Sequence, residues 1–188
     1  KDCSSLSSLN LTNFNTNHVE TSSGLFASCK NIKEINISNF DLSNNKDMSK
    51  MFYNCQSLTK IDFGNINTSN VEDMMGLFDE CISLTSVDLR NFDTKNVLDM
   101  SNMFQDCSKL KYINLSKFNT SKVQNMSNMF ESCITLSTID LSKFDTKEVK
   151  DMTKMFEYCK LTYLDISHFD TSNVESMLDM FAEMHNIV

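Results

Sequence analysis

The sequence contains no proline and only three glycines in its 188 residues. Proline lacks a backbone N–H donor and interrupts ladders of hydrogen bonds between strands. Its absence fits a chain whose units stack through continuous backbone ladders. There is also no run of apolar residues long enough to cross a bilayer as a helix, which excludes direct membrane insertion by this segment.

Positive charge is scarce. There is a single arginine, Arg90, and the formal net charge is −8. Proteins that bind nucleic acid usually carry a stripe of Lys and Arg that releases counterions from the phosphate backbone. No basic cluster is present in this sequence, so the composition argues against a nucleic acid partner.

Motifs for catalysis or metal binding are lacking as well. The sequence has no CxxC pair of the kind that zinc sites use. It has no nucleophile with a nearby base, no paired acid and base, and no phosphate loop. His18, His168 and His185 fall at unrelated positions of the repeat described next. We therefore expect no catalytic residue, no metal site and no cofactor.

The dominant feature of the sequence is a repeat. Neighbouring cysteines are 26 residues apart throughout, a fixed period typical of proteins that stack structural units into a solenoid. One residue is missing after Cys159, and Met184 stands where the next cysteine would fall. The seven cysteines are Cys3, Cys29, Cys55, Cys81, Cys107, Cys133 and Cys159.

The two halves of each unit have different periods. Residues 84–89 end in the alternation of apolar and polar side chains that a half-buried strand needs. In residues 97–104, the apolar side chains Val97, Met100 and Phe104 follow the spacing of one helix face. One short strand and one short helix are therefore predicted for each unit.

The expected helix has a predicted start. Asn96 and Asp99 precede the apolar stripe and fit a capping residue and its partner. Stacked in register, the units would place their strands about 4.8 Å apart. The result would be a curved slab with a strand face and a helix face.

The pattern LxxIxL is similar to that of leucine-rich repeats. The phrases FDTKNVLDMSNMFQDC at 92–107 and FDTKEVKDMTKMFEYC at 144–159 resemble the BspA-like leucine-rich-repeat surface proteins, including the repeats of mycoplasma surface lipoproteins. This resemblance covers essentially the whole chain. It implies an α/β leucine-rich-repeat solenoid with one short parallel strand and one short helix per 26-residue unit. It also implies surface display, in a family of which some members are adhesins toward host proteins.

Residues 1–188 are interpreted as a single array of about seven repeats. The chain starts and stops inside a repeat, whereas solenoids need polar terminal caps. The sequence is therefore expected to be a fragment of a longer protein at the cell surface or secreted, with any signal or anchor outside this segment. The open ends of such a stack would favour end-to-end self-association.

The cysteine column is interpreted as core packing, because free Cys behaves as a small buried hydrophobe. Side chains stacked in register would hold their Cβ atoms about 4.8 Å apart, whereas a disulfide needs about 3.8 Å. No cysteine has a consistent His or Asp partner. A Cu(I) site made of Cys and Met ligands is the alternative.

A polar column is expected to point outward from the strands. Like charges such as Asp62 and Asp88 would repel each other one unit apart. In one interpretation, solvation and hydrogen bonds to flanking hydroxyls offset the repulsion between these carboxylates. In the other, a weakly bound divalent cation offsets it. The column is Asn10, Asn36, Asp62, Asp88, Asn114, Asp140 and Asp165. A second column, expected to bond to backbone in a turn, is Asp93, Asn119, Asp145 and Asp170.

Positions that differ between units are better candidates for binding, because repeated columns serve the scaffold. Tyr112 and Tyr163 stand in one mixed column and are either aromatic anchors of an interface or scattered surface residues. Arg90 is expected to pair with Asp88, Asp62 or an acid of a ligand. The predicted strand-face binding residues are Tyr112, Tyr163, Arg90, Lys60, Asp62, Asp88, Asp140 and Asp165.

Three functions remain open at this stage. The first is a non-catalytic, surface-displayed adhesion module that recognises a host protein, matrix component or glycan through the open strand face. The second is a structural spacer that presents another domain. The third is cation-dependent adhesion through the Asp/Asn column.

Overall fold

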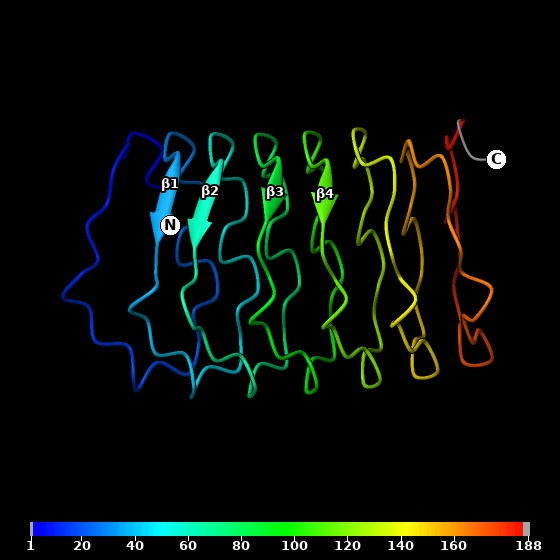
Figure 1. Cartoon of the computed structure of the whole chain (residues 1–188), viewed down its shortest axis with the longest axis horizontal. Helices are drawn as coiled ribbons and strands as arrows, with labels where there is room; N and C mark the ends of the chain where they lie inside the picture. Colours follow the sequence, from blue (N-terminus) through cyan, green and yellow to red (C-terminus); the bar gives the residue numbers. More distant parts are fainter. Residues whose placement is uncertain (1, 186–188) are drawn as a thin grey trace.

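Repeats of the chain lie side by side as coils in the computed structural model, which describes residues 2–185 (Figure 1). The N-terminal coil lies at one end of the stack and the C-terminal coil at the other. Parallel bridges join Thr21 to Asp47 and Asp47 to Asp73, and continue coil by coil to Ser176. Equivalent positions of neighbouring repeats are therefore in contact, and each repeat forms one coil.

Short parallel strands form on one side of the stack, here called the strand side. The first two strands pair with each other, and so do the last two. Ile35 and Val87 are buried between exposed polar neighbours, so the alternation in the sequence identified this segment. The strands are β1 (Glu34–Asn36), β2 (Lys60–Asp62), β3 (Ser86–Val87) and β4 (Tyr112–Ile113).

The predicted fold class is wrong in its second element. Residues 2–185 contain no helix, and consequently none that could cross a membrane. Where each repeat was expected to form a short helix, as at residues 97–104, the chain makes consecutive tight turns. Strands also form in only four of the described coils. The molecule is therefore not an α/β leucine-rich-repeat solenoid with one strand and one helix per unit.

These turn segments, exemplified by residues 99–107, are held by hydrogen bonds between coils. The N–H groups of Met100, Asn102 and Phe104 donate to carbonyls of the next coil at 2.9–3.0 Å. Between them, Met103 donates to the carbonyl of Met100 at 3.3 Å. Asn102 has a left-handed φ of 59°, which a right-handed helix does not contain. Similar residues recur in every coil and prevent continuation into a helix.

Coil spacing explains why a helical pattern gives no helix. Equivalent phenylalanine rings of neighbouring coils have centroids 5.5–6.1 Å apart. Packed helices need interaxial distances of about 8–10 Å. One helix per coil would therefore not fit at this spacing. The apolar stripe does identify the buried face, since Met100 and Phe104 are completely buried. Tight turns bury these side chains in a segment that is narrower than a helix.

The core consists of columns of like residues that run along the stack. The rings of Phe78 and Phe104, for example, are nearly parallel, at 14°. Each fully buried Phe contributes about 1.5–3 kcal/mol through apolar burial, which requires a coil on both sides. The central column is Phe52, Phe78, Phe104, Phe130 and Phe156, all without exposed surface.

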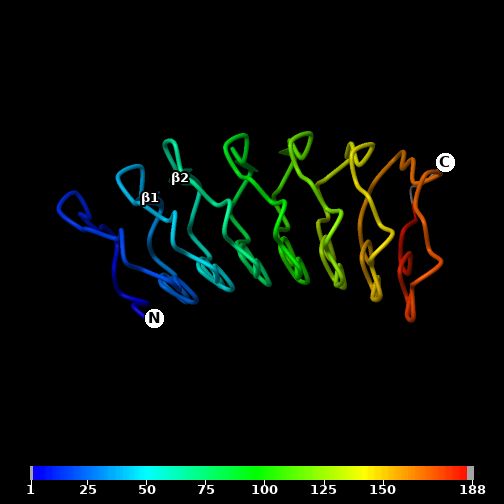
Figure 2. The ribbon, with the colours of Figure 1, turned by 90° about the horizontal axis from the view of Figure 1, so that it is seen from below.

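The coils are not equally close on both sides of the stack. Figure 2 shows them spread further apart toward the edge where β1 and β2 are labelled. On the opposite side, here called the turn side, the parallel bridges continue without a break from Thr21 to Ser176. On the strand side, the described ladder is interrupted between β2 and β3 and ends after β4. The strand side is therefore the more open side.

Asp and Asn side chains close three tight turns in each central coil. In one coil, Asp88, Asp93 and Asp99 accept the backbone N–H two residues later, at 3.2, 3.2 and 2.7 Å. This Asx-turn geometry is a known preference of both residue types. The expectation that the second polar column bonds to turn backbone is confirmed for Asp93, Asn119, Asp145 and Asp170.

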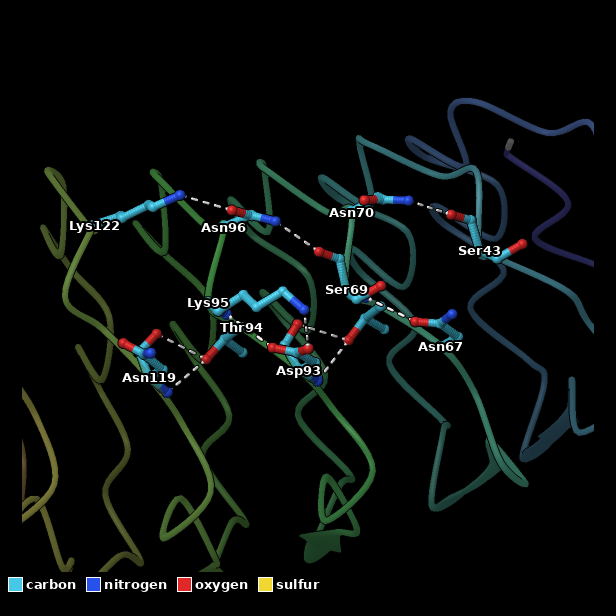
Figure 3. Close-up of polar contacts among 11 residues, drawn as sticks. Ser43, Asn67, Ser69, Asn70, Asp93, Thr94, Lys95, Asn96, Asn119 and Lys122 are labelled. Carbon is cyan, nitrogen blue, oxygen red and sulfur yellow. Dashed lines mark hydrogen bonds and ion pairs between the residues drawn. The ribbon is translucent and has the colours of Figure 1, made fainter.

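Other side chains join neighbouring coils directly (Figure 3). Asn96 is not a helix cap, because its amide nitrogen donates to the Ser69 carbonyl of the preceding coil at 2.8 Å. Lys122 of the following coil donates to Asn96 Oδ1 at 2.8 Å. Thr94 Oγ1 donates to the Asn119 carbonyl at 2.9 Å and accepts the Asn119 N–H at 2.8 Å. Such side chains extend the backbone ladder between coils.

Candidate binding face

The four predicted aspartates lie in one exposed column on the strand side. Each carboxylate accepts the backbone N–H two residues later, at 2.9–3.2 Å. The fold therefore needs an acceptor oxygen at this position and not a charge, because amides make the same bond at Asn10, Asn36 and Asn114. The charged members, which add negative charge to this face, are Asp62, Asp88, Asp140 and Asp165.

Arg90 pairs with Asp88 of its own coil. Its Nε lies 2.9 Å from the Asp88 carboxylate. This hydrogen bond lowers the pKa of Asp88 and raises the pKa of Arg90. The two side chains are 73% and 58% exposed, so the pair contributes little to stability. Of the three partners predicted for Arg90, the structure identifies Asp88.

Lys60 and Asp62 lie apart from the other candidates. In the pairing of β1 with β2, Lys60 lies opposite Glu34, and Asp62 lies opposite Asn36. Both border a hollow of about 430 Å³ that also reaches residues 7–9. Tyr112 is two coils further along the stack. The eight predicted residues therefore form no single site.

Tyr112 and Tyr163 flank a groove near the C-terminal half of the stack. They are 64% and 62% exposed. A hollow of about 260 Å³ lies beside Tyr112 and another of about 270 Å³ beside Tyr163, and the two share Ile139 and Asp140. The groove begins where β4 has no strand partner in the next coil of the described chain. We call it the tyrosine groove, defined by Tyr112, Ile139, Asp140, Tyr163, Asp165 and His168.

Two ionised carboxylates border the tyrosine groove. Backbone N–H groups of Ser142 and Ser167 hold the pKa of Asp140 and Asp165 below the ordinary value of a carboxyl group. Both therefore carry negative charge at neutral pH. Within residues 2–185, no group of three or more His, Cys, Asp or Glu is arranged to hold a metal ion.

His168 is a groove residue that the sequence interpretation missed. Its Nε2 lies 3.1 Å from the Leu141 carbonyl of the preceding coil. In the repeat alignment it occupies the same column as Asn39 and Asn91, whose amides also bond to the preceding coil. Comparison with this column would have placed His168 on the strand side.

The cysteine column lies inside the stack, away from the groove. Cys29, Cys55, Cys81, Cys107, Cys133 and Cys159 are buried free thiols. Cys3 is exposed, so the predicted burial is wrong at this position, where the described chain supplies a neighbouring coil on one side. The thiol of Cys107 donates to the Phe78 carbonyl at 3.2 Å, and four other cysteines make the equivalent bond.

Burial also makes these thiols poor nucleophiles. It raises the pKa of Cys55 and Cys159 to about 12 and that of Cys107 well above its ordinary value. The thiolate is the reactive form of cysteine, so the column is suited to packing and not to covalent chemistry at neutral pH.

A family model matches the repeat twice, over residues 1–111 and 78–188. Its description is "Mycoplasma protein of unknown function, DUF285". The chain belongs to this family. The match agrees with the resemblance to mycoplasma repeats found in the sequence, at the level of a Mycoplasma repeat family. A comparison with curated proteins gives no match.

Proposed function

We propose that this DUF285 chain is a non-catalytic binding module, displayed at the cell surface or secreted, which contacts a host protein, matrix component or glycan through its strand side. The observation that carries this proposal is the tyrosine groove. Tyr112 and Tyr163 expose most of their side chains there, beside hollows of about 260 and 270 Å³.

The dimensions and composition of the groove support a macromolecular ligand. Drug-sized ligands are usually held in enclosed clefts of about 300–1,000 Å³, and each hollow is smaller than this. A hollow of this size suits a side chain or a sugar unit of a larger ligand. Exposed Tyr side chains are among the residues that most often dominate the binding energy of protein interfaces.

Surface display rests on the family relationship. The repeat phrase resembles BspA-like surface proteins, and the match to a Mycoplasma repeat family supports that finer assignment. In such a protein, the stack would present its strand side to partners outside the cell. Localisation of the native protein by surface proteolysis of intact cells tests this part of the proposal.

The binding proposal is tested by surface plasmon resonance against a panel of extracellular matrix and serum proteins and by a glycan array. Tyr112→Thr and Tyr163→Thr are the appropriate variants, because Thr138 already occupies their column between them. Tyr158→Asn is the control, since Tyr158 is 47% exposed on the turn side and Asn54 fills its column at the same left-handed φ. Binding that is lost in the two groove variants and kept in the control supports the proposal.

Binding that is unaffected by the groove variants would contradict the proposed face. Absence of binding to every protein and glycan tested would favour the structural spacer, in which the stack only holds another domain away from the cell. Binding that disappears with a chelator would instead favour cation-dependent adhesion through the Asp/Asn column.

A further inference from the structure

The pair of Arg90 and Asp88 shows how a guanidinium group binds a carboxylate on the strand side. Arg90 stands two residues after Asp88 and donates to its carboxylate at 2.9 Å. In the coils that form the tyrosine groove, the position equivalent to Arg90 is occupied by Ser142 and Ser167. The groove therefore repeats the aspartate of this pair without the arginine.

Both groove carboxylates retain an acceptor oxygen. Asp140 Oδ1 accepts the N–H of Ser142 at 2.9 Å. Asp165 Oδ1 accepts the N–H and the hydroxyl of Ser167 at 3.0 and 2.8 Å. Among the described residues, the hydrogen bonds of these carboxylates come from Ser142 and Ser167 of their own coils, and neither carboxylate forms an ion pair. An incoming cation would therefore displace no side chain of opposite charge.

The aromatic side chains are placed to complete such a site. Tyr112 and Tyr163 are two coils apart, roughly 10 Å at the strand spacing, and Asp140 belongs to the coil between them. Guanidinium groups stack on aromatic faces and bind carboxylates through two parallel N–H donors. The half-buried Ile139 lines both hollows and offers an apolar surface for the aliphatic part of an arginine side chain.

We propose that the tyrosine groove binds an arginine side chain from a basic segment of a protein partner, with the guanidinium on Asp140 and Asp165 and against Tyr112 or Tyr163. This inference rests on the proposed function and names its ligand chemistry. The net charge of −8 favours encounter with a basic segment. A neutral glycan is the competing ligand, because it would use the tyrosines without needing the negative charge.

The test is an NMR titration of the isotope-labelled chain with N-acetylarginine amide. The lysine and citrulline analogues are the comparison ligands, because lysine keeps the charge without the planar group and citrulline keeps a planar group without the charge. We expect the arginine ligand to shift signals of Tyr112, Asp140 and Tyr163 first. Its affinity should exceed that of the lysine analogue severalfold, and the citrulline analogue should cause no comparable shift.

The double variant Asp140→Asn with Asp165→Asn should weaken arginine binding by about fivefold or more, as expected for two exposed charge pairs. Asn keeps the turn, because Asn114 fills this column naturally. Asp62→Asn, in the same column but outside the groove, is the matched control and should leave the affinity unchanged. Equal binding of the three ligands, or equal effects of the double variant and the control, would overturn the proposal.

The proposed binding face and the proposed arginine site can be contradicted independently of each other. A macromolecular ligand that is lost in Tyr112→Thr and Tyr163→Thr but retained by the double Asn variant would keep the binding face and overturn the arginine site. Binding of a glycan with those properties would identify the competing ligand. Loss of the macromolecular ligand in both sets of variants, together with arginine-selective shifts in the groove, supports both proposals.

Discussion

Single residues in this molecule are constrained mainly by the coils on either side. Ser22 and Asn45 illustrate this, because they stand where other coils have Met and Val. Both are buried, and the Ser22 hydroxyl lies 3.3 Å from the side-chain amide of Asn45. These two polar substitutions in the repeat therefore contact each other across neighbouring coils. Either one alone would leave its buried polar group without this partner.

Alkylation should show how strongly the stack protects its thiols. In the native protein, the reaction of Cys81, Cys107 and Cys133 with iodoacetamide should change little between pH 7 and 9, because burial excludes the reagent and raises the thiol pKa. In the unfolded chain, with a thiol pKa of about 8.5, the same change of pH should raise the rate about twentyfold. Peptide mass spectrometry measures both rates. Equal pH dependence in the two states would contradict the buried column.

The threonine bridges can be tested by an isosteric change. Thr94→Val removes the hydroxyl that both donates to and accepts from the Asn119 backbone. We expect the free energy of unfolding to fall by about 1–2 kcal/mol, because the N–H and carbonyl of Asn119 lose two part-buried hydrogen bonds. Thr138→Val is the control, since Thr138 is exposed, and should change stability by less than about 0.5 kcal/mol. Urea denaturation measures both values.

At the scale of an element, the turn segment decides the architecture. The spacing of its apolar residues fits a helix. However, its backbone N–H groups donate to carbonyls one repeat away, and not to carbonyls four residues earlier as in an α-helix. A local signal for this existed in the sequence. The column that contains Gly24 and Gly76 also contains Asn102 and Asn128, and all four have positive φ. Gly and Asn are the residues that adopt this conformation most readily, so the column marks a turn inside the expected helix.

The cost of the left-handed backbone is measurable at Tyr158, which has a φ of 59° and an exposed side chain. Tyr158→Gly and Tyr158→Val both remove the ring. The difference between their free energies of unfolding therefore reports the effect of the residue type on the backbone conformation alone. The Gly variant should be more stable by about 1 kcal/mol, because a β-branched residue is strained at positive φ while Gly is more flexible when unfolded. Similar stability of the two variants in thermal unfolding would argue against this turn geometry.

The turn side also makes stability depend on pH. Burial, with Glu80 and Asp106 nearby, raises the pKa of Asp79 to about 7, and Lys50 only partly offsets this. Glu131 also raises this pKa. The native state therefore binds more protons than the unfolded state between about pH 4 and 7. Its free energy of unfolding should fall as the pH rises through this range.

We expect a loss of about 1–2 kcal/mol between pH 5 and 8, reduced from the full shift because Asp79 is partly exposed. Urea denaturation at both pH values measures it. Asp79→Asn should be more stable than the parent at pH 8 and should flatten the profile. A parent protein that gains stability over the same range would contradict the assignment.

At the scale of the whole molecule, the two sides of the stack differ in how firmly they join the coils. Backbone hydrogen bonds link every described pair of neighbouring coils from Thr21 to Ser176 on the turn side, whereas the strand ladder is interrupted. The groove lies on the side with fewer such bonds. In the groove, the Thr162 N–H donates to the Ser137 carbonyl at 2.9 Å, and a ligand that touches several coils there would add further contacts between them.

Hydrogen exchange should report this difference directly. The amides of Met100, Asn102 and Phe104 are bonded to the next coil and should exchange more slowly than those of Thr138 and Asp140. In the 188-residue segment, protection should also decrease from the central coils toward both ends, because its first and last coils have a neighbour within the segment on one side only. Uniform protection on the two sides would contradict the broken strand ladder. Exchange followed by NMR resolves the individual amides.

Features of the fold that depend on interactions within one repeat could be predicted from the sequence, and those that depend on contacts between coils could not. The cysteine period identifies the size of a coil, and the alternation around Val87 identifies the strand side. The choice between helix and turns depends on distances between coils, which one repeat does not contain. The same holds for the groove: Tyr112 and Tyr163 are visible as variable positions, but the hollows beside them depend on how three neighbouring coils pack, which one repeat does not show.

The direction of the hydrogen bonds between coils has a mechanical consequence. These bonds run along the long axis of the stack, so a force that pulls its two ends apart loads them in tension and breaks one coil boundary at a time. Each released repeat of 26 residues would add up to about 90 Å of extended chain. In the proposed role of a surface-displayed binding module, the stack would therefore act as a tether that lengthens in steps at low force and absorbs a pull before the bound partner is released.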